Sequence, residues 1–174
     1  MVNNVLNFKV AGVTFENNEG KDIQKIIKSE VNELRQNGLI DEQYEGYTNA
    51  EIKEFDLNVQ QYTYKDFDVK LEETIFKDKP CIKIYIKKCN GDYVHIGYMP
   101  QNLINQYKEL ERISASIIGK AELIGGNYKH SNIVEIDYEE KEIIEIEELN
   151  YGLEVTLIFI RRKVLPILWE KGNY

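Results

Sequence analysis

Two lysines and a tyrosine alternate along one short segment of the chain, at Lys83, Tyr85 and Lys87. Alternation in a β-strand places such residues on one face. Lysines can follow a phosphate backbone while an interleaved aromatic ring stacks on a base, which contributes roughly 1–3 kcal/mol per stacked base. This pattern therefore indicates a surface for a nucleic-acid strand. The alternative is an ordinary solvated strand face, on which lysine discourages pairing with other chains.

Acidic residues gather in a second segment, from Glu135 to Glu148, with eight acids and one lysine, a net charge of −7. The whole chain carries −8, so the remainder carries only −1, and the segment from Lys77 to Lys88 carries +4. The overall charge argues against non-specific binding of nucleic acid. Charges further apart than about 8 Å act separately at physiological salt, however. The acidic segment alternates like a half-buried hairpin, and the alternative is a row of carboxylates that mimics DNA phosphates.

Motifs of known catalytic sites are absent from the sequence. There is no phosphate-binding G-x-x-x-x-G-K-[ST], no G-x-S-x-G and no H-E-x-x-H. His95, His130, Cys81 and Cys89 do not have the spacing of a zinc site. We expect surface histidines, cysteines within strands, no cofactor, no metal and no enzymatic activity, with a hydrolase or nuclease as the least favoured alternative.

The chain of 174 residues is 43% hydrophobic, which suits one domain with its own core. Its apolar runs are far shorter than the ~20 residues that span a bilayer. The N-terminus lacks the pattern of a secretion signal. Two cysteines are too few for a disulfide framework. We therefore expect a cytoplasmic protein that does not contact membranes.

Periodicity and turn signals predict a mainly antiparallel α+β fold. Helical spacing predicts a helix over 21–34, a capping box predicts a short one over 48–55, and a proline opens a third over 100–112. Strand signals cover 8–15, 57–71, 81–89, 92–99, 113–123, 133–138, 143–149 and 153–160. Strands joined by short turns favour a barrel or sandwich with two or three peripheral helices.

The pair Asn90-Gly91 predicts a hairpin, and the burial of isoleucines selects its register. A three-residue loop over 90–92 would place Ile86 opposite Ile96 and Ile84 opposite Tyr98. Lys83, Tyr85 and Lys87 would then lie outside with His95, and Tyr98 would face the core. A two-residue turn would instead place Lys83 opposite Tyr98, and it mixes polar and apolar residues on both faces.

Three segments together resemble the HIRAN domain family: 8–15, then 71–73 followed by 78–84, then 90–100. The resemblance covers about 7–130, apart from a helical insertion at about 16–65. It implies an OB-like, six-stranded β-barrel that binds single-stranded DNA and, in some members, captures the 3′ end. Phe15 matches the aromatic residue that stacks on the terminal base, Asp78 the carboxylate that contacts the 3′-hydroxyl, and Tyr98 a further polar ring.

The chain departs from the family pattern at three places, one of which is Pro80-Cys81 instead of the usual Asn-Ala. Lys77 stands where an aromatic residue often precedes the aspartate, and Tyr98 replaces a histidine. We expect a single HIRAN-like domain over 1–174 with a C-terminal hairpin extension at about 131–174, whose segment 164–169 packs on the barrel or forms a dimer contact. The expected function is non-catalytic binding of single-stranded DNA or DNA 3′ ends, the alternative an acidic protein-interaction or inhibitor module. The expected nucleic-acid-binding residues are Phe15, Asp78, Lys83, Tyr85, Lys87 and Tyr98.

Overall fold

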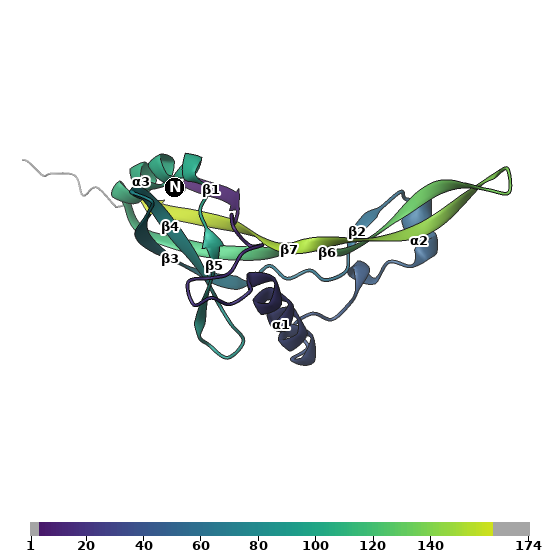
Figure 1. Cartoon of the computed structure of the whole chain (residues 1–174), viewed down its shortest axis with the longest axis horizontal. Coiled ribbons are helices and arrows are strands. Elements are labelled where there is room, and N and C mark those ends of the chain that lie inside the picture. Colours follow the sequence, from purple (N-terminus) through teal and green to yellow (C-terminus); the bar gives the residue numbers. More distant parts are fainter. Residues whose placement is uncertain (1–3, 162–174) are drawn as a thin grey trace, which may run out of the picture.

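The computed structural model describes residues 4–161, so the segment 164–169 lies outside the described residues. It is an elongated, mainly antiparallel β structure with three α-helices (Figure 1). The strands follow the order β1-β7-β6-β3-β4-β5, and β2 pairs with β6. The strands are β1 (Asn4–Lys9), β2 (Asn58–Gln60), β3 (Phe67–Phe76), β4 (Lys79–Lys87), β5 (Tyr93–Tyr98), β6 (Ser114–Ile136) and β7 (Glu139–Arg161). The helices are α1 (Ile23–Gln36), α2 (Asn49–Glu54) and α3 (Ile104–Arg112), with single 3₁₀ turns at Tyr44–Gly46 and Gln101–Leu103.

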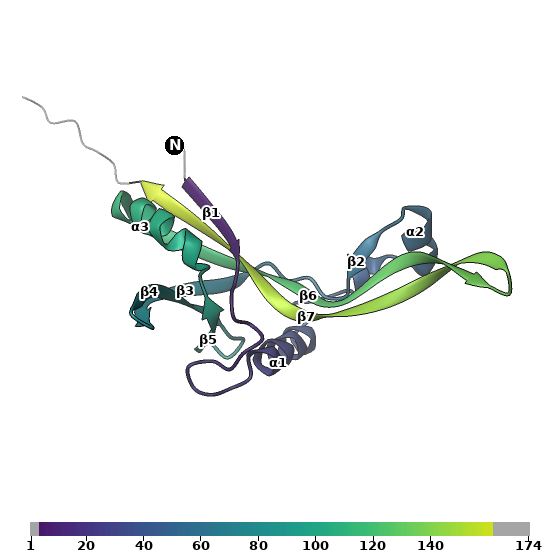
Figure 2. The same cartoon turned by 45° about the horizontal axis from the view of Figure 1, so that its top comes forward.

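One long hairpin, formed by β6 and β7, runs through the whole molecule (Figures 1 and 2). The prediction of four short strands here was wrong, because the glycines at 125 and 126 do not end a strand. Both have positive φ (83° and 79°), and opposite Gly125 the strand β7 carries one extra residue, a bulge at Asn150 and Tyr151 that shifts the register and accompanies a bend. Beyond the bend the hairpin continues as an arm, residues 126–149, beside which α2 and β2 lie.

The other end of the molecule is the head, in which the sheet curls around the main core. The predicted inner face of β4 is confirmed, since Ile82, Ile84 and Ile86 are buried. The predicted antiparallel, mainly β architecture is also confirmed. The sheet is not closed, however: its edge strands β1 and β5 do not pair, and within residues 4–161 the two edges are joined only by an isolated bridge between Ala11 and Tyr98. The barrel therefore stays a prediction.

The segment after β1 joins the opposite edge of the sheet through one pair of backbone hydrogen bonds. The N–H of Ala11 donates to the carbonyl of Tyr98 at 2.8 Å, and the N–H of Tyr98 donates back at 2.9 Å. The strand predicted over 8–15 instead ends at Lys9. Phe15 lies in the loop that follows, where its N–H donates to the carbonyl of Gly12.

The predicted register of the β4–β5 hairpin was wrong. The loop is Cys89–Gly91, one residue earlier than expected, and Lys88 N–H bonds to the Asp92 carbonyl. A bulge then shifts the pairing, so Lys83 lies opposite Tyr98 and Tyr85 opposite His95. The bulge lets β5 bury Ile96 and His95 although they are adjacent. Tyr98 consequently shares the outer face with the lysines.

Helix predictions within the insertion are confirmed. Asp22 caps α1, which buries the predicted apolar stripe, and Thr48 and Glu51 form the predicted capping box of α2. A small second core around Ile52 holds α2 and β2 against the arm through Ile144. None of the helices described is long and apolar enough to cross a membrane.

Candidate functional site

The outer face of β3, β4 and β5 carries the predicted strip of alternating residues. Residues directly opposite in an antiparallel pair share a face. Lys83 lies between Glu72 on β3 and Tyr98 on β5, and the neighbouring row places Tyr85 between Lys70 and His95. Three strands therefore contribute to one surface of mixed cationic and aromatic character.

Three aromatic rings form a corner at one end of this face, which we call the aromatic corner: Phe15, Phe76 and Tyr98. Phe15 is 71% exposed and Phe76 is 59% exposed, and the Phe76 and Tyr98 ring centroids lie 6.4 Å apart. Gly12 lies beneath two of the rings: an added Cβ there would lie 3.7 Å from the Tyr98 ring and 3.9 Å from the Phe15 ring. Large apolar side chains exposed together mark interaction surfaces more often than single ones do.

Cationic side chains lie at the aromatic corner and along the rest of this face. Lys77 Nζ lies 5.4 Å from the centre of the Phe76 ring, and Lys70 Nζ lies 5.9 Å from that of Tyr85. Lys83 Nζ lies 3.5 Å from a Glu72 carboxylate oxygen, with only 20% of its side chain exposed. Lys87 is exposed at the end of β4. Lys83 is therefore engaged within the chain, whereas Lys77 and Lys87 are available to a ligand.

The segment between Phe15 and α1 packs against the same face. The side-chain amide of Asn18 donates a hydrogen bond to the Tyr85 hydroxyl at 3.4 Å, and the backbone N–H of Asn18 donates to Nδ1 of His95 at 3.1 Å. His95 is only 2% exposed, so the prediction of a surface histidine was wrong for it. The ring packs between Tyr85 and Tyr98, with centroids 5.4 Å and 4.9 Å away. Burial lowers the pKa of His95 below its usual value.

This burial predicts a pH dependence of stability. The neutral ring is favoured in the folded state, and the unfolded chain therefore binds more protons near pH 6.5 and below. The free energy of unfolding should fall as the pH drops from about 7.5 towards the lowered pKa of His95. Urea unfolding of the wild type and His95→Phe across this range measures the effect. The two pH slopes should differ; parallel slopes would contradict the prediction.

The structure brings most of the predicted site residues together. Phe15, Tyr98, Lys83 and Tyr85 form one continuous surface, and Lys87 continues it along β4. Asp78 lies in the exposed two-residue turn after Phe76, with a φ of 60°. No hydrogen bond or ion pair joins its carboxylate to another residue within 4–161.

Sequence reasoning missed several members of this surface. The ring of Phe76 joins the corner because Lys77 and Asp78 form a two-residue turn with positive φ at both positions (48° and 60°), which folds β3 directly onto β4. No glycine or asparagine indicates that turn. Glu72 and Lys70 lie on this surface because of the register of β3 against β4, which only the structure shows.

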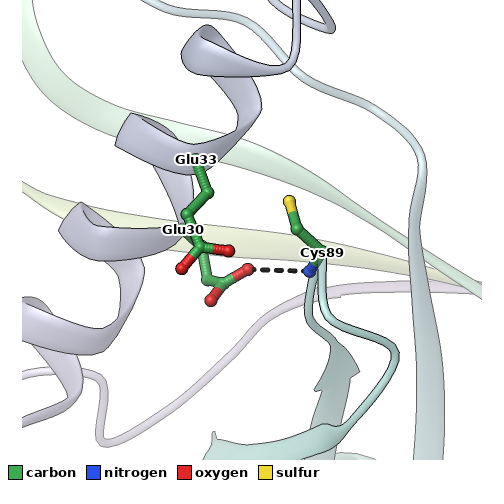
Figure 3. A group of neighbouring side chains, drawn as sticks. All are labelled: Glu30, Glu33 and Cys89. Carbon is green, nitrogen blue, oxygen red and sulfur yellow. Dashed lines mark hydrogen bonds between the residues drawn. The ribbon is translucent and has the colours of Figure 1, made fainter.

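One cluster of possible metal ligands occurs among the residues described: Glu30, Glu33 and Cys89 (Figure 3). Glu30 is fully buried, and its carboxylate accepts a hydrogen bond from the N–H of Cys89 at 3.0 Å. Lys88 Nζ lies 3.5 Å from the other carboxylate oxygen. Burial raises the pKa of the Cys89 thiol, and the two glutamates raise it further. A protonated thiol and a neighbouring ammonium group disfavour a cation, so these contacts serve to anchor α1 to the β4–β5 loop.

Comparisons with models of protein families, with curated proteins and with solved structures found no match to this chain.

Proposed function

We propose that this protein binds single-stranded nucleic acid, in the manner of a HIRAN-like module, with the aromatic corner as the stacking platform. The observation that carries this proposal is the exposure of the Phe15 and Phe76 rings beside Tyr98, with the ammonium group of Lys77 next to Phe76. Stacking on exposed rings contributes about 1–3 kcal/mol per base and tolerates any sequence. Lys77 and Lys87 supply charge for the backbone phosphates. This pairing of rings and cations favours nucleic acid over an uncharged ligand.

Asp78 supports the narrower proposal that the corner receives a 3′ end. Its turn directly follows Phe76 on β3, and its carboxylate has no partner within the described chain. A carboxylate accepts a hydrogen bond from a free 3′-hydroxyl and repels a 3′-phosphate. End capture would therefore place the terminal base on the rings and the terminal hydroxyl at Asp78.

We expect Phe15→Ala and Phe76→Ala each to weaken binding of a short, labelled oligodeoxynucleotide by about tenfold, because each variant removes one stacking ring. Fluorescence anisotropy at low salt measures the affinity. Phe55→Ala is the matched control, since Phe55 is 60% exposed but lies at the end of α2. An equal loss in the control, or no binding by the wild type, would contradict the proposal.

End capture has its own test with the same oligonucleotide carrying a 3′-hydroxyl or a 3′-phosphate. The wild type should prefer the hydroxyl, and Asp78→Asn should bind both about equally, because the repulsion of the phosphate is gone. Equal binding of both oligonucleotides by the wild type would refute end capture and leave strand binding intact.

A further inference from the structure

The arm has an unpaired strand edge that begins where the head ends. In the head, β1 covers this edge of β7 from Glu154 to Phe159. The side chain of Gln24 then covers one more position: its Nε2 donates to the Tyr151 carbonyl at 2.7 Å and its Oε1 accepts from the Tyr151 N–H at 2.9 Å. Beyond that point, within residues 4–161, β7 pairs only with β6.

The turn at the tip of the arm fixes which backbone groups face outward. Asp137 and Tyr138 both have positive φ, 55° and 64°, as in a type I′ turn. Ile136 and Glu139 are then a hydrogen-bonded pair, and such pairs alternate with residues whose N–H and C=O point away from β6. The outward-pointing groups on β7 belong to Glu140, Glu142, Ile144, Ile146 and Glu148.

One contact within the chain agrees with the outward direction of these backbone groups. Lys53, on α2, donates from its Nζ to the carbonyl of Glu142 at 2.6 Å. A cationic side chain thus already reaches a carbonyl of the edge. Ile146, four residues further from the tip than Glu142, is 58% exposed. The edge therefore offers backbone groups together with an apolar side chain.

The charge around this edge indicates which kind of strand would bind to it. Residues 139–148 contain six glutamates and one lysine, a net charge of −5. A second copy of this chain would bring the same charges against the first, and like charges on opposite strands repel. A lysine- or arginine-rich strand would instead bring opposite charges beside these glutamates.

We propose that the edge of β7 in the arm takes an additional strand from a basic partner, an extended lysine- or arginine-rich segment of another protein. Backbone hydrogen bonds would supply affinity, as in other cases where a peptide extends a sheet, and side chains would supply selectivity. The outward face of Ile146 would receive an apolar side chain of that segment. This interaction lies on the arm, so it does not depend on the proposed binding of nucleic acid by the head.

The probe is a fluorescent peptide of about nine residues in which lysine alternates with valine, long enough for one strand. Its control carries the same charge but has methyl groups on alternate backbone nitrogens, which removes donors to the edge. The parent peptide should bind more tightly than the methylated one by about tenfold or more, because charge alone cannot distinguish them. Equal affinities, or no binding of the parent peptide, would overturn the proposal.

A pair of protein variants tests the same edge from the other side. Ile146→Pro removes an outward-pointing N–H and leaves every hydrogen bond to β6 in place. Proline is tolerated at such outward positions of an edge strand. Ile146→Ala is the control for the lost side chain. The proline variant should weaken binding of the parent peptide by about tenfold or more, and the alanine variant should weaken it clearly less, because alanine keeps the N–H. If the protein alone is a dimer that Ile146→Pro makes monomeric, the edge binds a second copy and the proposal is wrong.

Discussion

Gly97→Ala is expected to lower the free energy of unfolding by about 3 kcal/mol or more, because it combines backbone strain with overpacking. Gly97 has a φ of 141°, in a region that residues with a side chain rarely adopt. A Cβ there would lie 2.6 Å from Cγ1 of Val10 and would collide with the carbonyl oxygen of Ala11. The pair of hydrogen bonds between Ala11 and Tyr98 would have to open, and with it the contact between the loop of Phe15 and β5.

Urea unfolding followed by circular dichroism measures this change, and Gly20→Ala is its control. Gly20 also has positive φ (72°), but an added Cβ there would meet no atom within 4 Å. The control should cost only about 1 kcal/mol, the strain of positive φ by itself. If both variants lose the same stability, the close approach of Ala11 has no energetic importance.

Glu30→Ala should cost about 3 kcal/mol, because it deletes a buried carboxylate that has two partners and leaves a cavity. The N–H of Cys89 would lose its acceptor, and Lys88 would lose its ion pair. Since α1 is tied to the β4–β5 loop through this side chain, the destabilisation should appear in global unfolding rather than as local fraying.

Two variants separate the contributions of Glu30. Glu33 lies about one helical turn after Glu30 and is only partly buried. The free energy of unfolding of Glu33→Ala should therefore stay within about 1 kcal/mol of that of the wild type. Glu30→Gln keeps an acceptor for Cys89 and should lose less than Glu30→Ala, since only the charge is removed. A Glu30→Ala variant as stable as the wild type would mean that this anchor contributes nothing.

Local signals predicted the helices and the buried face of β4 well. The apolar spacing of α1 and the capping box of Thr48 act within a few residues, so the sequence alone carries them. Ile82, Ile84 and Ile86 indicated their buried face for the same reason, since alternation is a property of a single strand.

Register and strand length escaped prediction because they depend on partners distant in sequence. The bulge opposite Ile84 and Tyr85 is selected by the burial of both His95 and Ile96, which no alternation pattern shows. The pair Gly125-Gly126 resembles a strand end, and only the pairing with β7 shows that the hairpin continues. Tyr98 was therefore expected inside, although its ring belongs to the aromatic corner.

The length of the β6–β7 hairpin bears on how an acidic protein would bind the proposed nucleic acid. From Gly126 to Ile136 the arm extends about 33 Å at the rise of a β-strand. Figure 1 shows this extension on the opposite side of the bend from β3, β4 and β5. Mobile ions attenuate fields over far shorter spans, so a strand at the lysines would scarcely experience the glutamates near the tip. The charges at the two ends of the molecule are thus screened from each other, so the two proposed ligands would bind without competing, with the hairpin as a spacer between them.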